Sequence, residues 1–69
     1  MKHQIKTIIE NNIGEPVDYA DPVLISFDEL ESIISDVQDE FNTEINIYKL
    51  KLDNFENMDE LINWINGRI

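Results

Sequence analysis

Apolar side chains recur at helical spacing in three stretches of this chain. In the middle stretch they follow one another at steps of three and four residues, which places them on one side of a helix: Phe27, Leu30, Ile33, Ile34, Val37 and Phe41. The same spacing predicts a first helix over residues 2–12 and a last helix between Asn57 and Gly67. Their apolar faces are Ile5, Ile8 and Ile9 in the first, and Met58, Leu61, Ile62 and Ile65 in the last. The pattern therefore predicts three main helices.

Polar residues and glycines mark where these helices begin and end. Ser26 is followed three residues later by Glu29, which matches the capping box, in which each side chain accepts the other residue's backbone N–H. Asn57 and Glu60 repeat this pattern before the last helix. Gly14 is suited to the left-handed conformation that ends many helices. We therefore expect Ser26 to be the N-cap of the middle helix.

Two segments connect the helices. Residues 15–25 (EPVDYADPVLI) contain two prolines, which disfavour a helix, and several apolar residues, so we predict an ordered loop that packs across the core. In residues 44–52 (EINIYKLKL) apolar residues alternate as in a strand, but the phase slips, and a lone short strand has no partner. We predict a loop followed by a short helical turn around Tyr48 to Leu52.

These elements define the expected fold class. It is all-α, a small bundle of three main helices plus one short helix, with a long loop between the first two helices. Residues 1–69 are expected to form a single domain, because a chain of this length is near the lower limit for a self-sufficient core.

The charge of the chain is strongly unbalanced. Fifteen acidic against five basic residues give a net charge of −10, and no Lys or Arg occurs between Lys6 and Lys49. Nucleic acids and anionic membranes are poor partners, because binding phosphate requires clustered basic residues. A basic protein surface is the expected counterpart. The outward circumference of the middle helix carries Asp28, Glu31, Ser35, Asp36 and Asp39.

The residue types needed for most catalysis are missing. There is no cysteine and a single histidine, His3, so thiol chemistry, a catalytic dyad and a zinc site have no basis. A chain this small cannot enclose a deep substrate cavity. We therefore expect no catalytic residue and no metal site. No apolar run reaches the roughly 18 residues of a membrane span, and the N-terminus is too polar for a secretory signal, so we expect a cytoplasmic protein, and a monomer.

Hydroxyl groups remain as candidates for chemistry. Of the three serines, Ser26 alone combines a helix N-terminus, an adjacent apolar residue in Phe27 and a preceding loop. A phosphate ester at this position would be favoured by free backbone N–H groups and by the helix dipole.

Two stretches of the sequence are similar to those of a known family. VQDEFNTEI (37–45) resembles the L-E-E-E-F-x-x-E-I pattern of acyl carrier proteins, and LDNFENMDELINWING (52–67) resembles the loop and last helix of that family. The chain is similar to acyl carrier proteins and peptidyl carrier domains over essentially its whole length. The resemblance implies a four-helix bundle in which the serine of a D-S-[LF] motif opens an acidic second helix and carries a 4'-phosphopantetheine arm.

In this chain the attachment motif corresponds to Ile25-Ser26-Phe27. The serine and the apolar residue after it are kept, but Ile25 stands in place of the aspartate. Counted back from Phe41, Ser26 lies one residue farther upstream than the family's serine, and an alignment without a gap places Phe27 there. A one-residue insertion in the first turns of the helix restores the register. The resemblance then implies Ser26 as the attachment site.

Three functional hypotheses follow. In the first, a phosphopantetheinyl transferase attaches 4'-phosphopantetheine to Ser26, and the protein shuttles thioester-bound intermediates between acyl- or aminoacyl-handling enzymes of fatty acid, polyketide or nonribosomal peptide biosynthesis. The basic patches of these enzymes would dock on Asp28, Glu31, Ser35, Asp36 and Asp39. In the second, the arm is absent and the protein is an interaction module that docks through the same helix. In the third, it is an acidic inhibitor of the immunity-protein or antitoxin kind that blocks a basic partner.

Overall fold

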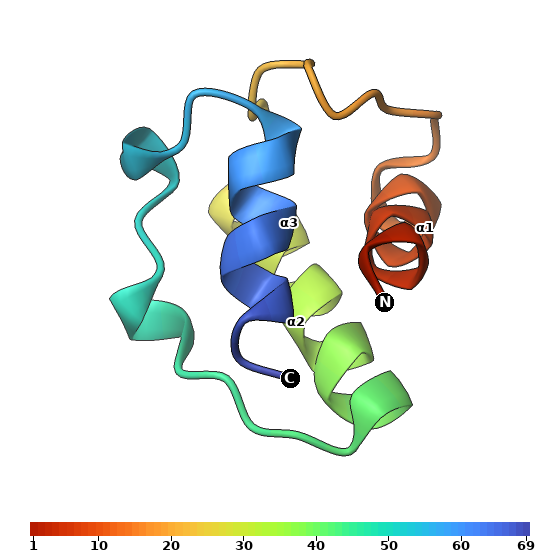
Figure 1. The fold of residues 1–69 in the computed structure, drawn as a ribbon, viewed down its shortest axis with the longest axis vertical. Helices are drawn as coiled ribbons and strands as arrows, with labels where there is room; N and C mark the ends of the chain where they lie inside the picture. Colours follow the sequence, from red (N-terminus) through yellow and green to blue (C-terminus); the bar gives the residue numbers. More distant parts are fainter.

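The computed structural model describes residues 1–69, and its regular structure is helical throughout, with no strand. α1 spans Lys2–Ile13, α2 spans Phe27–Phe41 and α3 spans Met58–Asn66, and two short 3-10 turns lie between α2 and α3. Three helices at the predicted places confirm the all-α fold class. Figure 1 shows α1 at one side of the molecule and the 42–57 segment at the other, with α2 and α3 between them.

The fourth, short helix predicted around Tyr48 to Leu52 is present only as 3-10 turns. The 42–57 segment forms two separate three-residue turns of this kind, Ile47–Lys49 and Leu52–Asn54. The first turn begins before Tyr48 because the side chain of Asn46 accepts the Tyr48 N–H (3.0 Å). The helical run ends at Leu50, because this residue takes extended backbone angles (φ −96°, ψ 118°) and is buried in the core.

Side-chain hydrogen bonds cap the N-termini of α2 and α3. Ser26 Oγ accepts the N–H of Glu29 (3.1 Å) and the Glu29 carboxylate accepts the N–H of Ser26 (3.0 Å), which confirms the capping box of α2. Asn57 caps α3 by accepting the N–H of Glu60 (3.0 Å). The predicted capping box also requires the Glu60 carboxylate to accept the N–H of Asn57. The Glu60 carboxylate instead accepts the N–H of the preceding residue, Glu56 (3.0 Å).

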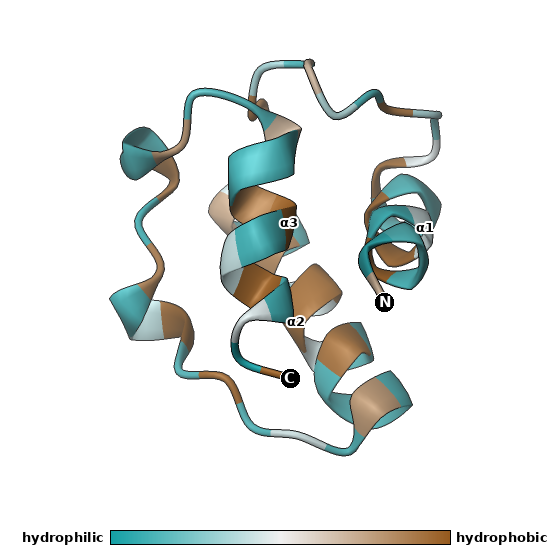
Figure 2. Ribbon diagram, viewed as in Figure 1, coloured by the Kyte–Doolittle hydropathy of each residue, from teal (hydrophilic) through white to brown (hydrophobic).

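Fourteen buried residues, all of them hydrophobic, form one core. The three helices contribute Ile5 and Ile9 from α1, Leu30, Ile33, Ile34 and Val37 from α2, and Met58, Leu61, Ile62 and Ile65 from α3. Figure 2 shows hydrophobic residues on the sides of the helices that face one another. Because no polar or charged residue is buried with them, the relative positions of the helices depend on hydrophobic packing.

The loop between α1 and α2 is an ordered part of the fold, as predicted. It starts at Gly14, whose left-handed backbone (φ 82°) ends α1. Val17 and Ile25 are buried in the core. The carbonyl oxygens of Tyr19 and Asp21 accept the first two N–H groups of α3, at 2.9 and 2.8 Å. These bonds satisfy two donors that a helix N-terminus leaves free, so the loop and the start of α3 stabilise each other.

Phe27 does not lie in the core, contrary to the apolar spacing of α2. It is 51% exposed, whereas Leu30, the next residue of the same stripe, is 1% exposed. Phe27 is the first helical residue, so no preceding turn of α2 covers it, and burial of the stripe begins one turn later. Leu24, at the end of the loop, is 82% exposed. Two exposed apolar side chains therefore flank Ser26.

Candidate functional site

Ser26 lies at the junction between the loop and α2, and it is exposed. Its backbone is extended (φ −73°, ψ 161°), which is the usual conformation of an N-cap residue. Its Oγ accepts one hydrogen bond, from the Glu29 N–H, and donates none to another protein atom. The hydroxyl hydrogen and one lone pair of Ser26 are therefore open to a reagent from solvent.

The surroundings of Ser26 contain donors for a phosphoryl group. The N–H groups of Phe27 and Asp28 have no acceptor within the protein, and they carry the positive end of the α2 dipole. Opposing this, Asp28 and Glu29 place two carboxylates in the first turn. The Glu29 carboxylate is already bonded to the Ser26 N–H (3.0 Å), which leaves Asp28 as the free acid of that turn. The free Phe27 and Asp28 N–H groups would favour a phosphate ester on Ser26 Oγ, and the Asp28 carboxylate would oppose it.

The five residues predicted for docking lie together on the outward side of α2. We call this set the acidic face; all of its members are exposed, and they are Asp28, Glu31, Ser35, Asp36 and Asp39. Asp28, Glu31, Ser35 and Asp39 follow one another at steps of three and four residues, which keeps them on one side of a helix with 3.6 residues per turn, and Asp36 borders this side. Ser26 is at the N-terminal end of the same helix, so the structure brings the candidate attachment site and the acidic face together.

Three of the five Lys and Arg side chains interact with groups away from the acidic face. Lys2 and Lys6 pair with carboxylates outside α2, at 2.9 and 3.3 Å, and both lie over the ring of Tyr19. Arg68 stacks on the ring of Trp64, 3.5 Å from its centre. No Lys or Arg forms a salt bridge with a carboxylate of the acidic face, so these charges are screened only by solvent and its ions.

One member of the acidic face also joins two helices. Asn12 of α1 donates a hydrogen bond to Asp36 (2.9 Å) and accepts one from Ser32 (2.6 Å). Asp36 is therefore less available to a partner than Asp28, Glu31 or Asp39. The sequence alone did not single out Asn12, because a polar contact between two helices has no spacing signal within either one.

Leu24 and Phe27 are the surface residues that sequence reasoning missed. Exposed apolar side chains beside a charged surface are typical of protein contact sites, whose centres are apolar and whose rims are polar. A signal for Phe27 was present, since the residue directly after an N-cap has no helical turn before it. For Leu24 the sequence carries no such signal, because its exposure depends on how the loop crosses the core.

The surroundings of the Glu10 carboxyl group lower its pKa. Its carboxylate accepts the N–H of Val17 at 2.9 Å and the Lys6 ammonium at 3.3 Å. The bond from the Val17 N–H is the main reason that the pKa of Glu10 is lowered from 4.5, and Lys6 lowers it further. Because Val17 lies in the first part of the loop, Glu10 has a structural role: it holds the loop against α1.

Together, fold and site define a small all-α protein with an exposed serine at the head of an acidic helix. No group of three or more His, Asp and Glu side chains is arranged to hold a metal ion. None of the helices has the length and apolar character needed to cross a membrane. No family model, no curated protein and no solved structure matches this chain.

Proposed function

We propose that this protein is a carrier, in which Ser26 bears a 4'-phosphopantetheine arm and the acidic face of α2 docks the enzymes that load and unload it. The observation that carries the proposal is the position of Ser26, an exposed hydroxyl at the head of a helix whose outward carboxylates have no basic partner. The similarity of residues 37–45 and 52–67 to acyl carrier proteins supports it.

Each part of the site has a separate task in this proposal. The arm, when attached, supplies a thiol that holds an acyl or aminoacyl group as a thioester. The Phe27 and Asp28 N–H groups bind the phosphate that links the arm to Ser26. The acidic face steers a basic enzyme surface toward Ser26, because complementary charge mainly raises the rate of encounter. Leu24 and Phe27 supply apolar contact next to the attachment point. The carrier itself needs no catalytic residue.

A second candidate is a docking module of the same fold without the arm, and one observation favours it. α2 runs without interruption from Phe27 to Phe41, so it contains no bulge that would mark the inserted residue required by the Ser26 register. In the register without a gap, Phe27 occupies the place of the modified serine, and Phe27 is exposed. Docking through the acidic face is common to both candidates.

Mass spectrometry of the intact protein separates the two candidates. The protein is incubated with coenzyme A and several phosphopantetheinyl transferases of differing specificity. We expect one arm-sized mass increment in the wild type and in Ser32→Ala, and none in Ser26→Asn. The asparagine variant is the negative control, because asparagine caps helices as well as serine does but has no hydroxyl group. An unchanged wild-type mass with every transferase would overturn the carrier and leave the docking module.

A gain-of-modification variant tests the docking module directly. The triple substitution Ser26→Asp, Phe27→Ser, Asp28→Leu writes a D-S-L motif in the register without a gap, and its aspartate retains the N-cap. If the wild type stays unmodified and this variant gains the arm, the fold is recognised by the transferase and the natural chain has lost its serine. If neither is modified, the carrier fails, and the docking module and the acidic inhibitor hypothesis remain. The inhibitor hypothesis requires one tight basic partner.

The role of the acidic face is measured in the same assay. The double variant Glu31→Lys, Asp39→Lys reverses two of its charges, and Glu44→Lys, Asp53→Lys reverses two exposed charges outside it. We expect the transferase to lose kcat/KM with the first pair at low salt and to keep it with the second. An equal loss with both pairs would mean that net charge, and not the acidic face, governs docking.

A further inference from the structure

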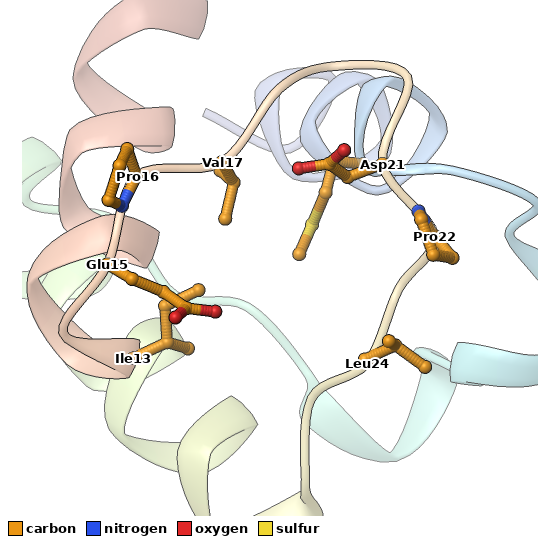
Figure 3. A pocket seen from close by; sticks show the side chains of 8 residues that line it. Ile13, Glu15, Pro16, Val17, Asp21, Pro22 and Leu24 are labelled. Carbon is orange, nitrogen blue, oxygen red and sulfur yellow. The ribbon is translucent and has the colours of Figure 1, made fainter.

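A pocket of about 280 Å³ opens beside the loop, between the end of α1 and the start of α3. Its apolar walls come from Ile13, Val17, Leu24 and Met58. Figure 3 shows that the side chains of Glu15 and Asp21 project from opposite sides of the loop toward the space between them. The pocket therefore combines an apolar surface with two carboxylates.

Hydrogen bonds hold the loop on both sides of this pocket. On one side, the N–H of Val17 is bonded to the Glu10 carboxylate (2.9 Å). On the other, the carbonyl of Asp21 accepts the Met58 N–H (2.8 Å), and its carboxylate accepts the N–H of Asp18 (2.9 Å). The loop also contains two prolines, whose rings restrict the backbone. Because a preformed site loses little conformational entropy on binding, weak contacts suffice to hold a small molecule.

The charges of the pocket select the sign of its ligand. No Lys, Arg or His lines it. The Glu15 carboxylate has no hydrogen-bond partner in the protein, and Asp21 uses only one of its two oxygens, for Asp18. The whole chain adds a net charge of −10, so fatty acids, phosphates and other anions are repelled. A positively charged group near Glu15 and Asp21 would be attracted.

We propose that this pocket binds a compact amphiphilic cation, with an apolar body against Val17 and Met58 and a primary ammonium between Glu15 and Asp21. The volume is close to the lower end of the range of about 300 to 1,000 Å³ found for small-molecule sites, so the apolar body is limited to a short chain or a small ring. The proposal does not depend on the arm at Ser26, because the pocket is complete in the unmodified protein.

The test is an NMR titration of the unmodified, isotope-labelled protein at constant ionic strength. Hexylammonium is expected to shift the backbone amide signals of Val17, Asp21 and Leu24 in a saturable way. Hexanol should bind more weakly, and hexanoate and methylammonium should give no saturable shift, because each lacks one of the two required features. Equal affinities for hexanol and hexylammonium, or no saturable shift with hexylammonium, would overturn the proposal.

Two variants assign the binding to the pocket. Glu15→Gln removes one carboxylate from an exposed position, and we expect it to weaken hexylammonium binding about two- to fivefold, the usual effect of a solvent-exposed ion pair. Glu44→Gln removes an exposed carboxylate that does not line the pocket, and the affinity should stay unchanged. A similar loss in both variants would contradict the proposal, since it would show that the diffuse negative field attracts the cation.

Discussion

Replacing Ser26 with alanine is predicted to destabilise the protein through the loss of one hydrogen bond. In the wild type, Ser26 Oγ accepts the N–H of Glu29 at 3.1 Å, while the Ser26 N–H is bonded to the Glu29 carboxylate at 3.0 Å. Alanine removes the first bond and leaves the second in place. Because Ser26 is exposed, the substitution opens no cavity, and the freed Glu29 N–H can bond to water. The loss is therefore that of a helix cap alone, about 1 kcal/mol.

This free energy converts into a measurable change in melting temperature. The entropy of unfolding is about 2.1 cal/mol/K per residue, hence about 0.14 kcal/mol/K for a chain of 69 residues. A loss of about 1 kcal/mol then lowers the melting temperature by about 7 °C. Ser26→Asn keeps an acceptor for the Glu29 N–H, so its melting temperature should stay within about 2 °C of the wild type.

Thermal unfolding followed by far-ultraviolet circular dichroism measures both effects. Ser35→Ala is the matched control, because Ser35 is exposed within the same helix and makes no side-chain hydrogen bond. Alanine is favourable inside a helix, so this control should not fall below the wild type. The reasoning is refuted if Ser26→Ala melts with the wild type, or if Ser26→Asn falls as far as Ser26→Ala. In the second case serine would stabilise α2 by something other than its cap.

Three further outcomes are expected. Raising sodium chloride from about 0.01 to 0.3 M should raise the melting temperature, because the carboxylates of the acidic face have no basic partner and salt screens their repulsion. A melting temperature that stays constant or falls with added salt would contradict this. Glu10→Gln should lower the melting temperature most near neutral pH, and the difference from the wild type should shrink as the pH falls below 4.5. The reason is that a group with a lowered pKa in the folded state stabilises the fold only while it is ionised, so a difference independent of pH would argue against a role for the charge of Glu10. Ile9→Val, at a fully buried site, should lower the free energy of unfolding in urea by about 0.5 to 1.5 kcal/mol, whereas Leu24→Ala at the surface should change it by less than about 0.5 kcal/mol. Equal losses would show that Leu24 packs in the core.

The three helices could be predicted from the sequence because their determinants are local. The 3.6-residue period of apolar side chains and the residues that cap each helix act over a few positions. The 42–57 segment differs, because its shape is set by distant contacts. Leu50 is buried in the core, and its backbone is extended. This extended residue interrupts the single helical turn that the local pattern favours around Tyr48 to Leu52. A contact made across the fold thus overrides the local preference.

The candidate site also has features that could be predicted from the sequence and features that could not. The capping box at Ser26 and the exposure of the acidic face follow from positions along one helix, so both were predictable. The exposure of Leu24 and the pocket beside it were not, because they result from backbone bonds between the loop and the start of α3. Those bonds join residues almost forty positions apart, and no feature of residues 15–25 indicates which helix end will receive them.

The distribution of ion pairs gives a reason to connect the acidic face with binding. The two salt bridges of the protein stabilise its packing: Lys2 joins α1 to Asp59 of α3, and Lys6 supports Glu10, which holds the loop. The acids outside on α2 make no such contribution, apart from the bond of Asp36 to Asn12, and their mutual repulsion disfavours the folded state. These charges are concentrated beside an exposed serine and two exposed apolar side chains, and this arrangement supports the proposal that the acidic face docks a basic surface, which would neutralise the charges on contact.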